Sequence, residues 1–253
     1  IAWRKWAESK GATTRNQSHG SPANLLDLYA ASGIPETEGS DILGYKLASS
    51  SAHVTGKNLA SSEAATWLDE HFFSSLGDVK PVLDKFFLGG INHICYHGTT
   101  YSPQNEEWPG WMFYASVHFG TTNTFWKDFH ALNSYVTRCQ SFLQAGKPDN
   151  DVLVYFPVYD LWSQPGRSRL VHFSATPPNT ISGVGQKLLR SGYSFDYISD
   201  RQINDLKFSG DSIHTSNISY QAIIVPRCNL IPLETFRKLL ELANSGAKII
   251  FEN

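Results

Sequence analysis

Six polar side chains in the first hundred residues stand where predicted β-strands end. They are Gln17, His19, Glu36, Glu38, Glu63 and His97. In a parallel α/β arrangement the carboxyl ends of the strands meet at one edge, so we expect these side chains to face a common basin. Hydrolysis of a glycosidic bond needs two carboxyl groups, one as acid and one as base or nucleophile. An isolated glutamate is more often a solvated residue or a helix N-terminal charge, so only their joint placement favours a hydrolytic site.

Two histidines on the last of these strands offer a different chemistry. His93 and His97 occupy alternate strand positions facing one side, which resembles a metal pair, but the pattern favours hydrogen-bonded structural histidines. The three cysteines lie far apart without a C-x-x-C motif, so neither a zinc site nor a disulfide framework is indicated.

The elements that must position these groups alternate between helix and strand, the pattern of a parallel sheet with helical crossovers. The predicted strands cover residues 13–17, 34–36, 58–62 and 91–96. The predicted helices cover residues 1–10, a segment from Ser21-Pro22 to Gly33, and residues 45–55 and 78–88. Four strands spaced by one repeat unit each predict half of a (β/α)8 barrel.

The remaining chain begins with an aromatic loop at residues 98–123, followed by an amphipathic helix at 125–145 that Gly146 ends. A second pattern follows, with strands at 152–158, 220–225 and 248–251 and helices at 186–190 and 233–244. We therefore expect residues 1–147 to be the C-terminal half of the barrel and residues 148–253 a smaller, incomplete α/β domain. Both chain ends look cut, so the missing half-barrel is expected in the remainder of the same polypeptide.

Composition excludes several classes of protein. Charged residues make up 17% of the chain and the net charge is −2, which leaves no broad basic field for nucleic acid or anionic lipid. No apolar run is long enough for a membrane span. Aromatic residues reach 13%, which suits either a large aromatic core or rings that stack on sugars.

Several ordered blocks of the sequence resemble family 106 glycoside hydrolases, the α-L-rhamnosidases. They are Arg15-Asn16-Gln17-Ser18-His19-Gly20-Ser21-Pro22, Ile34-Pro35-Glu36-Thr37-Glu38, His97-Gly98-Thr99-Thr100-Tyr101, Trp108-Pro109-Gly110-Trp111, residues 138–146 and residues 149–153. The resemblance implies an inverting glycosidase on a (β/α)8 barrel with accessory domains, a calcium ion near its active site, a rhamnose-containing carbohydrate as substrate, and a secreted or periplasmic location.

The resemblance also implies roles for individual residues. Glu63 and Glu38 are the candidate catalytic carboxylates, with Glu63 as general base. The general acid is expected upstream of Ile1. Glu36 is the candidate calcium ligand, although Glu36 and Glu38 both suit calcium or sugar binding. The candidate substrate-binding residues are Gln17, His19, His97, Tyr101 and Trp111, and plain loop packing is an equal reading for Trp111.

Two other functions compete with rhamnoside hydrolysis. One is a different barrel glycosidase, such as a β-galactosidase-like hydrolase. The other is a carbohydrate-binding protein without catalysis.

The second α/β segment lacks a phosphate-binding glycine fingerprint, because Gly183-Val184-Gly185 has no third glycine at the required spacing. Its role is therefore predicted to be structural.

Overall fold

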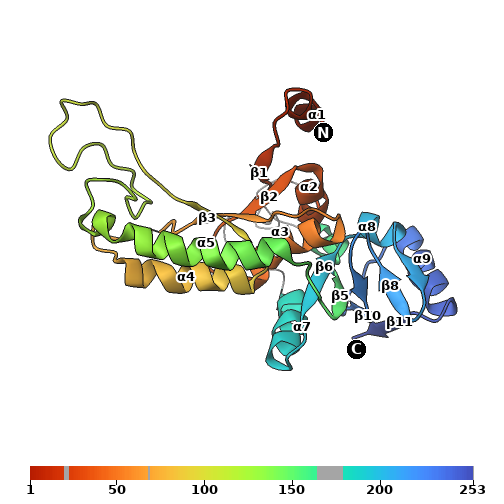
Figure 1. Ribbon diagram of the computed structural model, residues 1–253. Helices are drawn as coiled ribbons and strands as arrows, with labels where there is room; N and C mark the ends of the chain where they lie inside the picture. The colour runs from red at the N-terminus through yellow and green to blue at the C-terminus, as the bar shows by residue number, and fades with distance from the viewer. Residues whose placement is uncertain (20–22, 68, 164–178, 253) are drawn as a thin grey trace.

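The first half of the protein is a parallel sheet of four strands in the order β1-β2-β3-β4 (Figure 1). A computed structural model describes residues 1–19, 23–67, 69–163 and 179–252. The strands are β1 (Arg15–Gln17), β2 (Ile34–Thr37), β3 (Ser61–Ala64) and β4 (His93–Tyr96). The alternating helices are α1 (Ala2–Glu8), α2 (Leu25–Ala31), α3 (Ile42–Val54) and α4 (Leu76–Leu88). The predicted alternation of helix and parallel strand is confirmed.

Side-chain caps decide where the helices begin. Asn24 caps α2 by accepting a hydrogen bond from the Leu26 amide, so this helix starts later than predicted. The predicted cap at Ser21-Pro22 lies outside the described residues. Asp41 caps α3 through the Leu43 amide, and this helix therefore begins before Tyr45, its predicted start.

Strand β3 begins three residues later than predicted, at Ser61 rather than Asn58. The Asn92 side chain explains the delay, because its Oδ1 accepts from the Ala60 amide at 3.0 Å and its Nδ2 donates to the Asn58 carbonyl at 2.8 Å. These contacts hold the segment before the strand out of the ladder. As a result Glu63 lies inside β3, paired in register with Cys95, instead of following the strand.

The segment between β4 and the next helix has no helix or strand up to residue 123, as predicted. It projects beyond the ends of α4 and α5 in Figure 1. A short 3-10 helix η1 (Thr124–Lys127) then leads into α5 (Phe129–Ala145), which Gly146 ends. Helix α5 packs along α4, where Tyr135 donates a hydrogen bond to Asp84 at 2.5 Å. Phe142, near the end of α5, is exposed.

The second half holds another parallel sheet, ordered β11-β10-β5-β6, and an antiparallel sheet β7-β8-β9. The parallel strands are β5 (Val152–Tyr155), β6 (Phe195–Ile198), β10 (Ala222–Val225) and β11 (Lys248–Phe251). The helices are α6 (Val158–Trp162), α7 (Asn179–Arg190), α8 (Asp200–Asn204) and α9 (Leu233–Asn244). The antiparallel strands are β7 (Lys207–Ser209), β8 (Ser212–His214) and β9 (Ser219–Tyr220).

Several elements of this half differ from the sequence prediction, among them helices α6 and α8, which were not predicted, and helix α7, which begins at Asn179 and not at residue 186. Strand β6 was not predicted, because the charged Asp196 interrupts its apolar run. The hairpin of β7 and β8 was also not predicted, since both strands are short and half polar. The predicted strand 220–225 divides at Gln221 between two sheets, since β9 pairs with β8 whereas β10 pairs with β5 and β11.

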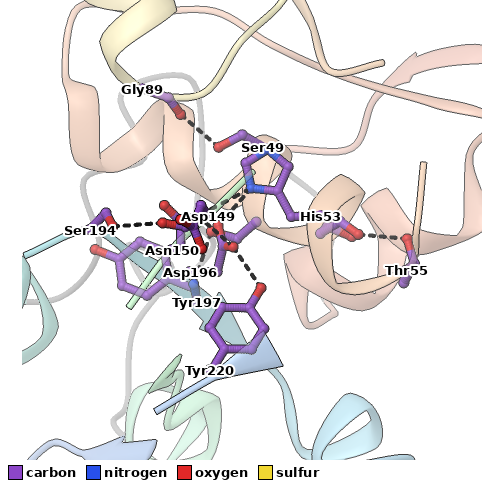
Figure 2. A network of polar contacts seen from close by, with 12 residues as sticks. Ser49, His53, Thr55, Gly89, Asp149, Asn150, Ser194, Asp196, Tyr197 and Tyr220 are labelled. Atoms are coloured by element: carbon purple, nitrogen blue, oxygen red, sulfur yellow. Dashed lines mark hydrogen bonds and ion pairs between the residues drawn. The ribbon is translucent and has the colours of Figure 1, made fainter. Parts of the chain in front are cut away.

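The two halves share one hydrophobic core and a buried polar junction. A single buried cluster joins Leu47 of α3 to Val154 of β5 and Phe195 of β6. Asp196 of β6, fully buried, contacts His53 Nδ1 of α3 at 2.9 Å (Figure 2). The division of the chain at residue 147 stays a prediction. Among the described residues, no helix is both long and apolar enough to cross a membrane.

Candidate active site

Strands β1, β2 and β3 bring an amide and two carboxylates together on one face of the first sheet. The Gln17 side-chain amide donates to Glu63 Oε2 at 2.6 Å and lies 3.3 Å from Glu36 Oε1. In strands, residues two apart face the same side, so Gln17, Glu36 and Glu63 align across three neighbouring strands. The sequence prediction of a shared basin is confirmed for these three residues.

Glu38 and His19 complete the basin from the segments that follow β2 and β1. His19 Nε2 lies 3.1 Å from Glu38 Oε1 and 2.9 Å from Gln17 Oε1. Both Glu38 and His19 are largely shielded from water, with side chains 11% exposed. Both side chains therefore belong to one hydrogen-bonded cluster with Gln17.

Glu38 and Glu63 form a carboxyl pair that shares a hydrogen bond. Burial first, then the negative charge of Glu63 and the hydrogen bond with it, raise the pKa of Glu38 to about 7. The charge of Glu36 adds to this effect. Glu38 therefore keeps its proton up to about pH 7, well above the range in which a glutamate ordinarily ionises.

The remaining contacts of Glu63 orient its other oxygen. Thr66 donates to Glu63 Oε1 at 3.0 Å, and His97 Nε2 lies 3.7 Å from the same oxygen. His97 is held in turn by Nδ1, which donates to the Ala115 carbonyl at 2.9 Å. Glu63 therefore has a fixed orientation with its side chain still 27% exposed, as a group that must reach a substrate requires.

Glu36 makes contacts that do not suit a calcium ligand. Its Oε2 accepts from Arg15 Nε at 3.0 Å and from Ser61 Oγ at 2.9 Å, while Oε1 faces the Gln17 amide. Calcium takes six to eight oxygen ligands. Here both Glu36 oxygens already face hydrogen-bond donors, and one of them is paired with the guanidinium of Arg15. Within the described residues there is no group of three His, Cys, Asp or Glu placed to hold a metal. The residues present do not fit calcium at Glu36, and calcium itself stays a prediction.

The histidine pair considered from the sequence divides between two environments. His93 is the first residue of β4, where burial and the positive charge of Arg15 lower its pKa. His97 lies beyond the strand end beside Glu63. The structural interpretation fits His93, and His97 belongs to the carboxylate cluster.

The two aromatic residues predicted to bind sugar lie apart from the carboxylates. Tyr101 and Trp111 are on the long loop, exposed to 94% and 56%, and line a cavity of about 240 Å³ that does not include the glutamates. The backbone amide of Trp111 donates to Ser102 Oγ at 2.8 Å, which ties the two arms of the loop together. The loop, rather than the sheet, positions these two rings.

Sequence reasoning missed four neighbours of the cluster. They are Arg15, Ser61, Thr66 and Cys95. Strand alternation could have found three of them, since Arg15 is two residues before Gln17, Ser61 two before Glu63 and Cys95 two before His97. Thr66 follows the strand and is placed by the turn after it, for which the sequence carries no signal.

The geometry limits what the carboxyl pair can do. Acid and base stand about 6.5–9.5 Å apart in inverting glycosidases and about 5 Å apart in retaining ones. Glu38 and Glu63 are immediate neighbours, so no sugar ring lies between them. The Glu63 side chain is the more exposed of the two, at 27% against 11% for Glu38.

Comparisons with known proteins agree with this chemistry. The chain is 29% identical over 210 residues to a protein of Formosa agariphila named "Putative beta-glucuronidase", which covers 81% of this chain and 16% of that protein. A solved rhamnosidase from Novosphingobium sp. PP1Y matches 98% of this chain with a TM-score of 0.79 at 19% identity. A GH42 β-galactosidase, Gan42B, matches 99% with a TM-score of 0.59 at 11% identity. These two likenesses show a shared α/β fold.

The matches extend over most of this chain but over only a small part of each relative. The chain spans 16% of the curated relative and 24% of the solved rhamnosidase. A family profile described as α-L-rhamnosidase, glycoside hydrolase family 106, matches residues 27–253. Since that match covers most of the chain, including every glutamate of the cluster, this chain belongs to the family 106 α-L-rhamnosidases.

Proposed function

We propose that the whole protein hydrolyses terminal α-L-rhamnosides of a plant polysaccharide or glycoconjugate with inversion of configuration. The observation that carries this proposal is the cluster of Gln17, Glu38 and Glu63 at the carboxyl ends of three parallel strands. Family membership supports the substrate class.

In this proposal Glu63 is the general base. Its oxygen accepts a proton from a water molecule, which attacks the anomeric carbon as the bond to the leaving oxygen breaks. A general acid on the opposite side of the sugar protonates that oxygen. Glu38 does not serve as this acid, because it is hydrogen-bonded to the base itself. Glu38 is a positioning residue that lies beside Glu63 and links it to His19.

Gln17, His19 and His97 hold the carboxylates and offer groups for the sugar hydroxyls. Gln17 uses its amide on Glu63 and its oxygen on His19, so it fixes the distance between β1 and β3 at the site. His97 Nε2 is not used by the backbone bond that Nδ1 makes, and it lies 3.7 Å from Glu63 Oε1, so a sugar hydroxyl beside the pair could contact both groups.

We further propose that the four parallel strands are the C-terminal half of a (β/α)8 barrel. The polar inner face supports this, because a sheet face carrying Arg15, Glu36 and Glu63 is suited to a barrel mouth that holds a substrate. The missing strands would come from the remainder of the same polypeptide. We also expect a secreted or periplasmic location, where plant polysaccharide is available.

The test is Glu63→Gln in the full-length enzyme. We expect turnover of a nitrophenyl α-L-rhamnoside to fall by about 10²–10⁴-fold, since this is what a general base contributes. The KM should change little, because the amide keeps the shape of the carboxylate. Glu70→Gln, at an exposed position outside the cluster, is the matched control. Parental turnover in Glu63→Gln would show that Glu63 is not the base.

One alternative substrate has a specific observation in its favour, the name of the 29%-identical relative. Cleavage of β-glucuronides would require a cation for the uronate group, and Arg15 is the nearest one to the cluster. A panel of nitrophenyl α-rhamnoside, β-glucuronide and β-galactoside separates these substrates directly. Because both Arg15 and Glu36 are engaged with each other, we expect the rhamnoside to be preferred.

A further inference from the structure

The long loop after β4 forms, together with Phe72, the wall of a small polar cavity. The cavity has a volume of about 240 Å³, and its wall includes Phe72, Tyr101, Trp111 and the threonines 99, 121 and 122. This is below the ~300–1,000 Å³ of pockets that take drug-sized ligands, so it suits one small ring. We call it the loop pocket.

The lining of the loop pocket combines hydroxyl groups with aromatic faces. The side-chain hydroxyls of Thr99, Thr121 and Thr122 make no hydrogen bond within the described part of the chain, so they are available to a ligand. Phe72 is fixed by ring contacts with Trp108 at 5.6 Å and with His118 at 4.8 Å. Free hydroxyls beside ring faces are groups that bind a sugar, which is polar at its edge and apolar on its faces.

The charge of the loop pocket indicates which sugars fit. The lining residues contain no Lys, Arg, Asp or Glu. Their titratable ring, His118, contacts His71 Nδ1 at 2.7 Å through Nε2, and burial and the His71 charge lower its pKa. The pocket is therefore neutral, so a neutral sugar is favoured over a uronic acid.

The backbone fixes the loop pocket close to Glu63. The loop base is closed by Gly98, whose amide donates to Ser116 Oγ at 2.9 Å and whose carbonyl accepts from the Phe119 amide at 3.1 Å. Thr99 in the pocket wall follows His97 by two residues, which is at most about 7 Å of chain. His97 in turn lies 3.7 Å from Glu63. The pocket wall therefore begins two residues along the chain from a histidine that lies beside Glu63.

We propose that the loop pocket binds the first ring of the leaving group, and that this ring is a neutral sugar. The inference rests on the proposed function, since an enzyme that removes a terminal sugar meets every further ring of its substrate on the leaving-group side. In this proposal Tyr101 and Trp111 contact the leaving group, which keeps them among the substrate-binding residues that the family resemblance implies.

The test compares two substrates in the full-length enzyme. Rutinose has rhamnose linked to glucose, and methyl α-L-rhamnoside lacks the second ring while keeping an alkyl leaving oxygen. We expect Trp111→Ala to lower kcat/KM for rutinose about tenfold, as for loss of one ring contact, and to leave methyl rhamnoside within about twofold. Thr122→Val should show the same pattern. Tyr114→Ala, exposed on the same loop but outside the pocket wall, is the matched control and should change neither.

Two results overturn the proposal. One is an equal loss for both substrates in Trp111→Ala, and the other is a parent enzyme that does not prefer rutinose. If the parent cleaves neither rhamnoside, the proposed function fails, and the loop pocket is then tested by calorimetric titration with glucose. Glucose binding that Trp111→Ala weakens supports a sugar pocket, whereas no binding to the parent overturns it.

Discussion

Replacing Glu38 with glutamine tests the carboxyl pair without removing its geometry. Glutamine has the shape of protonated Glu38, and its amide can donate to Glu63 as the shared proton does. Its oxygen can still accept from His19, which lies 3.1 Å from Glu38 Oε1 in the parent. The substitution therefore removes only the capacity to ionise.

The magnitude follows from the raised pKa of Glu38. Moving that pKa from the ordinary 4.5 to about 7 corresponds to about 3 kcal/mol against the ionised form in the folded protein. Water and salt reach the site in part, and we reduce this to about 1–2 kcal/mol. Because the folded state holds the proton more tightly than the unfolded state, parental stability falls as pH rises from about 4.5 to about 7.

The assay is thermal unfolding of parent and Glu38→Gln across this range of pH. At about pH 8 we expect the variant to unfold about 2–8 °C higher than the parent, since each kcal/mol moves Tm by about 2–4 °C in a protein of this size. At about pH 5 the gain should be less than half as large, because parental Glu38 is then mostly protonated in the folded state. Glu70→Gln, at an exposed site, should show no pH-dependent difference.

Either of two outcomes would refute the reasoning. A gain of the same size at both pH values would mean that the substitution acts through packing and not through ionisation. A lower Tm at about pH 8 would mean that ionised Glu38 is stabilised by its surroundings, and the shared proton would have to be abandoned.

Two further predictions concern the junction and the metal. Although burial raises the pKa of Asp196, the charges of His53 and Lys46 and the hydrogen bonds from His53 and Asn150 together lower that pKa. Tyr220 also donates to Asp196 at 2.8 Å (Figure 2). Asp196→Ala leaves these partners buried without their carboxylate, so we expect about 3–5 kcal/mol of destabilisation by chemical denaturation, against none for the exposed Asp69→Ala. An Asp196→Ala protein as stable as its parent would show that the junction adds nothing. For calcium, chelation should lower Tm and activity if the ion is bound, and readdition should restore both, whereas unchanged values would count against any calcium site.

The sequence carried enough information for most elements of the fold. Helix α9 was predicted at its observed bounds, because its apolar residues follow a helical period without a competing signal. Strand β6 was not found, since Asp196 reads as a surface residue unless its partners His53 and Tyr220 are known. Those partners come from α3 and β9, which local pattern cannot bring together.

What the sequence by itself determined is the set of groups at the strand ends. Alternation of helix and strand requires parallel strands, and parallel strands place Gln17, Glu36 and Glu63 at one edge. Tertiary structure decided the contacts of each of these side chains, because their pKa values and orientations depend on neighbours distant in the chain. Only the folded arrangement ties Glu36 to Arg15, pairs Glu38 with Glu63, and carries Trp111 away from the carboxylates on a loop.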